Sequence, residues 1–335
     1  MSVTRIVVDA MGGDNAPGEI IKGALEALPL YPDAHIILSG RREAVEAGLS
    51  GKSYPSDRLE ILDAPEVIET GEPPVKAVRT KKESSLVKGL MMVRGGEADA
   101  FITAGSSGAT LVGGQIIVGR IRGIERPPFA PIIPTATGPA LLIDCGANVD
   151  ARASHLVQFA QMGSIYMENV VGIRRPRVAL LNIGAEEEKG NALIKETMPL
   201  LRELTNINFI GNIEARDIPA GGADVVVSDA FAGNIALKMY EGVAATLLSE
   251  IKKGMTSTLR AKIGALLVKP ALKETLKSFD ASAYGGAPML GLTGLVVKTH
   301  GNAKANEIRN AVGQCIEWKD KAINDRFVEE MGLKK

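Results

Sequence analysis

Two stretches of this 335-residue sequence share one pattern: ADAFITAGSSG at residues 98–108 and ADVVVSDAFAGN at residues 223–234. Each begins as a short apolar run typical of a buried strand, and each ends in small residues that precede an amphipathic stretch. A helix that begins at such a turn directs free backbone N–H groups, and the positive end of its dipole, toward an anion. The alternative, for either stretch alone, is that its glycine serves only the tight geometry of the turn.

The same alternation of short strands and amphipathic helices extends along the chain. We expect strands at residues 5–9, 35–39, 58–62, 99–103, 140–144, 177–182, 207–211, 224–228 and 295–298, and helices at 17–27, 83–94, 153–171, 192–204, 231–253 and 303–327. This order predicts an α/β fold of the doubly wound, Rossmann-like type, with a mostly parallel sheet and helices on both faces. Ligands bind such folds beyond the carboxyl ends of the strands. No Pro/Ser-rich linker divides the chain, which predicts a single α/β domain over residues 1–335.

Composition disfavours several classes of protein. Thirty-nine Lys and Arg balance thirty-nine Asp and Glu, and aromatic residues are few, which disfavours a general nucleic-acid binder. The only two cysteines, Cys145 and Cys315, fall within expected elements, as in a protein of a reducing compartment. The apolar run at residues 6–8 is too short for a signal peptide, so we expect a cytoplasmic protein. Residues 100–119 carry no charge, but their five glycines favour buried sheet and loop over a membrane span.

Five expected strand ends carry small and polar residues. They are DAMGGDN at 9–15, TAGSSG at 103–108, DCGAN at 144–148, NIG at 182–184 running on to KGN at 189–191, and SDAFAGN at 228–234. Small residues let a ligand approach the main chain, while Asn, Ser and Lys side chains add donors. The set predicts a crevice that holds a compact anion and polarises an oxygen atom.

Familiar nucleotide, metal and hydrolase motifs are absent. No two glycines are separated by a single residue, so the dinucleotide fingerprint is missing, and residues 51–53 (GKS) lack the first glycine of a P-loop and are expected to form a surface turn. The three histidines lie far apart in sequence, and we expect no metal site and no cofactor. His35 and His155 are expected to be structural, whereas His300, in the loop at residues 298–302 before the last expected helix, is a candidate for lining the site. Ser106 and Ser107 would need a base to act as nucleophiles, and the sequence identifies none.

Two polar side chains stand out at these strand ends. Lys189 follows three glutamates and precedes a helix start, where the dipole disfavours a cation, so it is a candidate for holding a bound anion. Asn234 lies just inside a helix, where Asn is a poor helix former and its amide can face the crevice. The plainer alternatives are a solvated lysine among glutamates and an ordinary turn asparagine.

A basic amphipathic segment occupies residues 251–277. Seven basic residues and one acid give it a local charge of 7 − 1 = +6, and apolar residues recur every four positions from Ile251 to Ile263. Pro270 is expected to break or kink the segment, giving a protruding helical hairpin at about residues 250–278. Three roles remain open: contact with a membrane or an acidic partner, packing of a dimer, or plain core.

These motifs, together with YGGA at 284–287 and HG at 300–301, resemble the bacterial phosphate acyltransferase (PlsX) family over essentially the whole chain. Ser106 and Ser107 stand where Asn and Thr are common in that family, and both pairs supply donors. The resemblance implies acyl transfer from acyl carrier protein to inorganic phosphate, giving acyl phosphate for phospholipid synthesis. It also implies a fold similar to phosphotransacetylases and isocitrate-dehydrogenase-like enzymes, and a homodimer that touches an anionic membrane surface peripherally.

The resemblance implies that Lys189 and Asn234 are catalytic. The residues expected to bind substrate are Asp9, Gly12, Gly13, Asn15, Gly105, Ser106, Ser107, Gly108, Asp144, Asn148, Gly190, Asn191, Asp229, Gly233 and His300. The residues expected to touch the membrane are Leu259, Ile263, Leu266 and Leu267. Competing interpretations are a CoA-dependent phosphotransacetylase, a metal- and NAD-dependent dehydrogenase on the same scaffold, and a non-catalytic lipid- or carrier-binding protein.

Overall fold

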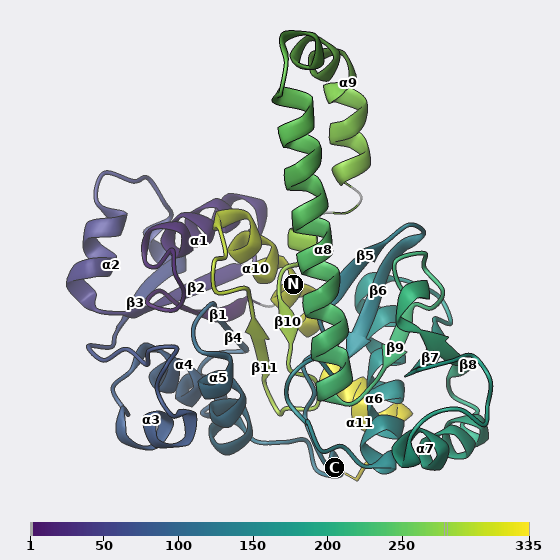
Figure 1. The fold of residues 1–335 in the computed structure, drawn as a ribbon. Helices are drawn as coiled ribbons and strands as arrows, with labels where there is room; N and C mark the ends of the chain where they lie inside the picture. The colour runs from purple at the N-terminus through teal and green to yellow at the C-terminus, as the bar shows by residue number, and fades with distance from the viewer. Residues whose placement is uncertain (1–2, 278, 280, 335) are drawn as a thin grey trace. The chain divides into compact units, whose positions relative to one another are not determined.

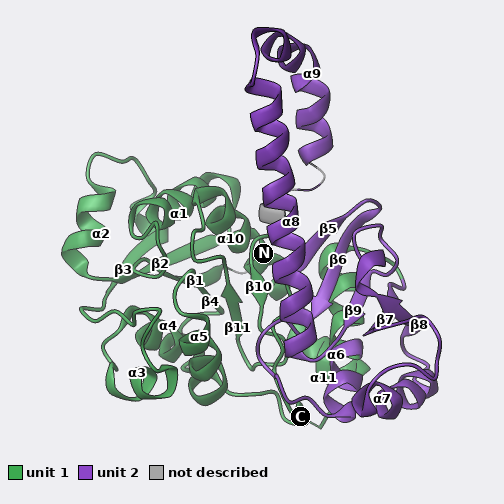
Figure 2. Ribbon diagram, viewed as in Figure 1, with its two compact units in different colours: residues 1–131, 161–174, 282–335 green, residues 132–160, 175–281 purple. Residues whose placement is uncertain are grey.

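The computed structural model describes residues 3–277, 279 and 281–334. Contacts divide the chain into two compact units, one comprising residues 1–131, 161–174 and 282–335 (unit 1) and the other residues 132–160 and 175–281 (unit 2) (Figure 2). Each unit contains its own sheet, so the strands expected from the sequence form two sheets rather than one. The assignment of the whole chain to one domain stays a prediction.

Unit 1 is built on a six-stranded sheet in the order β10-β11-β4-β1-β2-β3. Its strands are β1 (Thr4–Asp9), β2 (Ala34–Gly40), β3 (Leu59–Asp63), β4 (Ala100–Thr103), β10 (Ala287–Pro288) and β11 (Leu295–Lys298). All neighbours run parallel except β10, which pairs antiparallel with β11. Strands β1 and β4 are buried almost throughout, which explains their nearly continuous apolar sequences.

Helices cover both sides of this sheet (Figure 1). Helices α1 (Gly18–Leu30) and α10 (Ala305–Asp320) pack together, and a Cβ atom at Gly23 would lie only 2.5 Å from the Ala305 carbonyl oxygen. Helix α4 (Ser85–Arg94) packs its Gly89 against Val7 and Phe101 of the sheet. The remaining helices are α2 (Arg42–Leu49), α3 (Pro74–Thr80), α5 (Ser107–Gly113) with the π-helical turn Gly114–Val118, the 3₁₀ turn Ser56–Arg58, and α11 (Ile323–Glu330).

Unit 2 is built on a five-stranded sheet in the order β5-β6-β9-β7-β8. Its strands are β5 (Ile132–Thr135), β6 (Gly138–Ile143), β7 (Arg177–Asn182), β8 (Asn208–Glu214) and β9 (Val225–Val227), of which only β5 is antiparallel to its neighbour. Leu142, Ala179 and Val226 form part of a core on which Ala236 and Leu237 of helix α8 (Ala230–Thr256) pack. The other elements of unit 2 are α7 (Ala192–Glu203) and the 3₁₀ turn Ala215–Asp217. The chain passes from one unit to the other within α6 (Ala153–Tyr166), which ends in the π-helical turn Met167–Val171, and again within the 3₁₀ turn Ala281–Tyr284.

A helical hairpin extends away from the strands of unit 2 (Figure 1). It consists of α8 (Ala230–Thr256) and α9 (Leu259–Lys277). The expected break at Pro270 is wrong, because Pro270 lies inside α9 and the chain reverses at residues 257–258. There the Thr258 hydroxyl accepts a hydrogen bond from the Ala261 N–H (3.1 Å), which caps the start of α9.

The fold class predicted from the sequence is confirmed, and all nine expected strands are present with small shifts of their ends. The expected helix over residues 303–327 is wrong in one respect: it is two helices, separated where Ala322 adopts a positive φ of 49°. Both cysteines are free and buried. Among the described residues, no helix is long and apolar enough to span a membrane.

Candidate active site

The predicted site residues of unit 2 follow three neighbouring strands. Strand β9 pairs parallel with both β6 and β7, so the segments that follow these strands leave the same edge of the sheet. These segments are residues 144–148 after β6, 228–234 after β9 and 182–191 after β7. The structure therefore places Asp144, Lys189 and Asn234 on segments that start side by side, with Asn234 inside the helix α8 (Ala230–Thr256) that begins after β9.

Asp144 organises the first of these loops. Its side chain is buried and its two oxygens accept hydrogen bonds from the backbone N–H groups of Gly146 (3.2 Å), Ala147 (3.2 Å) and Asn148 (2.8 Å), and from the Asn148 amide (2.8 Å). The Asn148 carbonyl in turn accepts from the Ala230 N–H (3.0 Å), which ties this loop to the start of α8. The carboxylate thus acts as a fixed acceptor that holds the loop in shape.

Cys145, next to Asp144, is not an available nucleophile. Burial raises the pKa of its thiol well above the ordinary value, and the negative charge of Asp144 raises it further. A thiol in this environment stays protonated near neutral pH, so the reactive thiolate is not formed.

The start of α8 brings Asn234 to the surface beside this loop. Asp229 caps the helix, with its carboxylate accepting from the Ala232 N–H (2.9 Å). Gly233 is required by close packing, since a Cβ atom there would lie 1.9 Å from the Asp144 carbonyl oxygen. Asn234 is exposed, and its side-chain amide has no hydrogen bond to any other described residue. Its N–H groups are therefore open to a ligand.

Lys189 lies in the turn before α7, and its side chain is about half exposed. Its Nζ atom is 2.7 Å from a carboxylate oxygen of Glu186. Hydrogen bonding between the two groups raises the pKa of Lys189 and lowers the pKa of Glu186. The lysine is therefore a cation near neutral pH. Asn191 caps α7 by accepting from the Ile194 N–H (3.0 Å), and Gly190 adopts a positive φ of 108° that favours glycine.

Two asparagines that the sequence analysis did not assign to the site hold this turn. The Asn182 amide donates to the Lys189 carbonyl (3.1 Å), while its side-chain oxygen accepts from the Ile183 N–H (2.8 Å). Asn212, on β8, donates its amide to the Glu186 carbonyl (3.1 Å). The NIG motif placed Asn182 at a strand end, which was the signal for it. Nothing in the sequence linked Asn212 to this turn.

The predicted site residues of unit 1 also gather at strand ends. The buried Asp9 carboxylate accepts from the Thr103 hydroxyl (2.7 Å) and from the Met11 N–H (3.2 Å), and the Gly105 N–H donates to the Thr103 hydroxyl (2.9 Å). Burial raises the pKa of Asp9, although these hydrogen bonds oppose the shift. A Cβ atom at Gly12 would lie 2.6 Å from the Asp9 carboxylate. The loops after β1 and β4 are therefore packed directly on one another.

The loop that carries His300 joins this group. The Asp14 N–H donates to the Gly301 carbonyl (2.7 Å), and the Asn15 amide donates to the carbonyls of Asn302 (2.9 Å) and Ala303 (3.2 Å). His300 itself is exposed, so its ring is accessible beside these backbone contacts. His35 pairs with Glu60, and the buried His155 accepts from the Arg152 N–H, in keeping with their expected structural roles.

The serine pair of unit 1 divides into a buried and an exposed member. Ser106 is buried and caps α5, with its hydroxyl oxygen accepting from the Ala109 N–H (3.3 Å). Ser107 is exposed at the first residue of α5, and Gly108 packs closely on Pro74. Within the described part of the chain, no group of three or more His, Cys, Asp or Glu side chains is arranged to hold a metal ion.

Comparison with known proteins identifies the family. A sequence model described as "Fatty acid synthesis protein" matches residues 4–326. A protein of Clostridium acetobutylicum named phosphate acyltransferase is 47% identical over 326 residues, covering 97% of this chain and 98% of its own. A protein of the same name from Clostridium novyi is 47% identical over 323 residues, covering 96% and 97%.

The chain belongs to the bacterial phosphate acyltransferase (PlsX) family. The resemblance seen in the sequence is thereby confirmed, and the chain is an acyltransferase of fatty acid and phospholipid synthesis. Solved structures agree on the fold of this acyltransferase. A phosphotransacetylase from Streptococcus pyogenes superposes with a TM-score of 0.61 at 18% identity, covering 95% of this chain and 94% of its own. The EutD phosphotransacetylase from Staphylococcus aureus gives a TM-score of 0.58 at 16% identity, covering 94% of each chain.

The Asp144 network leads to a stability prediction for this acyltransferase. Asp144→Asn replaces one carboxylate oxygen by an NH₂ group, which faces backbone N–H donors and cannot accept from them. We expect the free energy of unfolding, measured by urea denaturation followed by circular dichroism, to fall by about 1–3 kcal/mol. Asp150→Asn, at an exposed position of the same loop, is the matched control and should change it by less than about 0.5 kcal/mol. Equal stability of the two variants would contradict the role assigned to Asp144.

Proposed function

We propose that this acyltransferase moves the acyl group of an acyl carrier protein thioester onto inorganic phosphate and releases an acyl phosphate for phospholipid synthesis. The observation that carries the proposal is that a cationic lysine and an asparagine amide lie on segments that follow two neighbouring strands of unit 2, β7 and β9. The asparagine amide has no protein partner among the described residues. The lysine cation can bind an anionic nucleophile, and the asparagine amide can donate a hydrogen bond to a developing oxyanion.

In the proposed reaction, an oxygen of hydrogen phosphate attacks the thioester carbonyl carbon. The new C–O bond gives a tetrahedral oxyanion, which collapses as the C–S bond breaks. The thiolate leaves, and the proton of hydrogen phosphate ends on the thiol. Phosphate near neutral pH already carries negative charge and free lone pairs, so the step depends on proximity and fixed donors rather than on a strong base.

Lys189 is assigned to phosphate and Asn234 to the oxyanion. Hydrogen bonding to Glu186 keeps the Lys189 ammonium charged, and the exposed position of that pair lets an incoming phosphate replace the carboxylate. Asn182 fixes the backbone of Lys189, so the cation stays at the strand end. The unpartnered amide of Asn234 is available to donate to the oxyanion, beside the loop that Asp144 holds.

The other predicted site residues are proposed to shape and hold substrate within their own units. In unit 2 these are Asp144, Asn148, Gly190, Asn191, Asp229 and Gly233. In unit 1 they are Asp9, Gly12, Gly13, Asn15, Gly105, Ser106, Ser107, Gly108 and His300. The hydrogen bonds of Asp9, Asp144 and Asp229 within the protein support a bracing role for these carboxylates.

The direct test incubates the protein with acyl carrier protein carrying a palmitoyl thioester and with labelled phosphate. Formation of an acid-labile, labelled acyl phosphate is the expected result. Acetyl-CoA in place of the carrier thioester is the second arm and tests for phosphotransacetylase activity. Binding of the acylated carrier without any phosphate-dependent loss of thioester would instead support a non-catalytic carrier-binding protein.

The two catalytic assignments lead to a prediction for turnover in this assay. Lys189→Ala and Asn234→Ala should each lower kcat by on the order of 10²–10³, the cost of losing a preorganised donor. Lys195→Ala, which removes another exposed lysine six residues along the chain, should leave kcat unchanged. Normal turnover in both site variants would remove the assignment.

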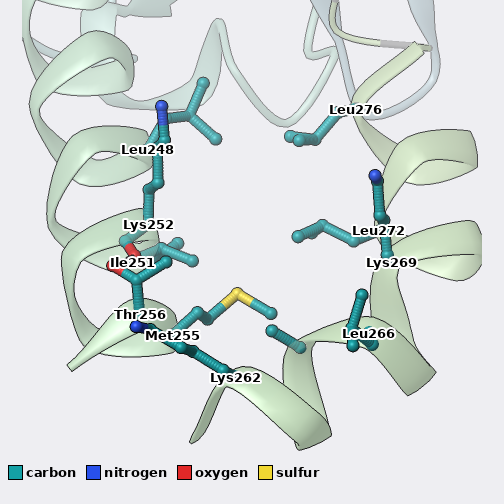
Figure 3. A pocket seen from close by; sticks show the side chains of 11 residues that line it. Leu248, Ile251, Lys252, Met255, Thr256, Lys262, Leu266, Lys269, Leu272 and Leu276 are labelled. Carbon is teal, nitrogen blue, oxygen red and sulfur yellow. Dashed lines mark hydrogen bonds between the residues drawn. The ribbon is translucent and has the colours of Figure 1, made fainter. Parts of the chain in front are cut away.

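The helical hairpin supports a further part of the proposal, a homodimer. The facing sides of α8 and α9 leave a cavity of about 660 Å³ lined by apolar residues such as Leu248, Ile251, Met255 and Leu272, with three lysines at its margin (Figure 3). Of the 27 residues of α8, only Ala230 and Gly233 are buried. Two helices that enclose so little of their apolar surface need a partner, and we assign the hairpin of a second copy to this role.

The end of the hairpin carries the proposed membrane contact. Leu259, Ile263, Leu266 and Leu267 are all strongly exposed at the start of α9. Arg260, Lys262 and Lys269 lie among or next to them and are also exposed or partly exposed. Apolar side chains flanked by cations suit an anionic lipid surface, where each basic residue contributes roughly 1 kcal/mol. The same basic charge suits the acidic acyl carrier protein.

Membrane contact can be measured separately from activity. Leu259→Glu combined with Ile263→Glu should abolish cosedimentation with liposomes that contain phosphatidylglycerol, because it removes apolar contact and adds negative charge. Activity in the absence of lipid should be retained. The control pair Leu30→Glu and Met91→Glu changes similarly exposed residues of unit 1 and should leave lipid binding intact. Unchanged sedimentation of the hairpin variant would refute the contact.

A further inference from the structure

The strand ends of unit 2 expose large apolar side chains as well as polar donors. Val149 follows β6, Ile183 follows β7 and Phe231 follows β9, and their exposed fractions are 57%, 80% and 63%. The three strands are neighbours in the sheet. The other residues of these turns are mostly small or polar. A large exposed apolar side chain in each of the three segments therefore indicates a surface that binds an apolar ligand or partner.

Phe231 and a further exposed apolar residue, Ile235, flank Asn234 on α8. Phe231 precedes Asn234 by three residues, and Ile235, which is 54% exposed, follows Phe231 by four. Residues three and four apart lie on one face of a helix, so Phe231 is a neighbour of both Asn234 and Ile235. The hydrogen bond between the Ala230 N–H and the Asn148 carbonyl brings residue 149 to the first turn of this helix.

We propose that Val149, Ile183, Phe231 and Ile235 form an acyl-contact surface that binds the first part of a long aliphatic acyl chain. The inference rests on the proposed function, in which the thioester carbonyl lies at the Asn234 amide. The acyl chain starts at the atom bonded to that carbonyl carbon, so its first methylene groups must lie beside Asn234. Burying those methylenes against exposed apolar side chains removes both surfaces from water.

The chemistry of this surface distinguishes its occupant. Contact with Phe231 or Ile235 adds no favourable binding free energy for phosphate. An aliphatic chain, in contrast, gains binding free energy with each methylene group that it buries. The competing occupant is a second copy of the chain, because exposed apolar residues continue along α8 at Met239, Val243 and Leu247. The position of Phe231 and Ile235 beside the proposed oxyanion donor favours the acyl chain.

The test compares a long and a short acyl group on the same carrier. Acyl carrier protein loaded with palmitoyl or butyryl groups is assayed with phosphate and with wild type, Phe231→Ala and Ile235→Ala. For each site variant we expect kcat/KM to fall at least about tenfold with palmitoyl and less than about threefold with butyryl. Ile210→Ala removes a comparably exposed isoleucine from β8 and should preserve the wild-type ratio. Sedimentation velocity records the oligomeric state of every variant.

Each outcome has a distinct meaning. Selective loss of the long-chain substrate with an unchanged oligomeric state supports the acyl-contact surface. Equal loss with both substrates, or loss accompanied by dissociation, assigns these residues to folding or to a subunit contact and overturns the inference. Unchanged kinetics with both substrates also overturns it. Failure of the wild type to consume either thioester refutes the proposed function itself, and the variants are not needed to detect that failure.

Discussion

Buried carboxylates at strand ends are the constraint on which the candidate site loops of each unit depend. Asp144 accepts hydrogen bonds from three successive backbone N–H groups and one side-chain amide. Asp9 accepts from the Thr103 hydroxyl at the end of the neighbouring strand β4 and from the Met11 N–H of its own loop. Each converts a sequence of small residues, which has little preferred conformation, into a turn of fixed shape. Electrostatic catalysis requires hydrogen-bond donors that are in place before the reaction. The buried carboxylates meet this requirement indirectly, because they fix the turns next to which the exposed donors lie.

The polar side chains at the strand ends of unit 2 differ in whether they bond within the protein. Asp229, Asn182 and Asn191 use their side chains within the protein, as caps or as links between turns. Among the described residues the Asn234 amide has no such partner. The Lys189 ammonium pairs with the exposed Glu186 carboxylate, which another anion can replace. In unit 2 these two exposed groups are the ones to which we assign the anion and the oxyanion, and exposed apolar side chains follow the same three strands.

Much of this arrangement is visible in the sequence, because it depends on local patterns. The strands of β1, β7 and β11 are apolar runs with clear ends, and glycine turns mark the loops after them. The short antiparallel strands β5 and β10 could not be seen, since β5 contains Pro134 and β10 has only two residues. The sequence at residues 257–258 gives a weaker indication of a chain reversal than Pro270 does, and α9 nevertheless contains Pro270. Asn212 reaches the Lys189 turn only through pairing of β8 with β7, a contact that spacing along the chain does not reveal.

The central claim is that separate fixed groups hold phosphate and stabilise the oxyanion. Calorimetric titration of inorganic phosphate into wild type, Lys189→Ala and Asn234→Ala tests it most directly, because binding is then measured without the chemical step. The account predicts that Lys189→Ala weakens phosphate binding by about tenfold or more, as expected for loss of a charge-assisted hydrogen bond, and that Asn234→Ala leaves the affinity nearly unchanged. Wild-type phosphate affinity in Lys189→Ala would contradict it.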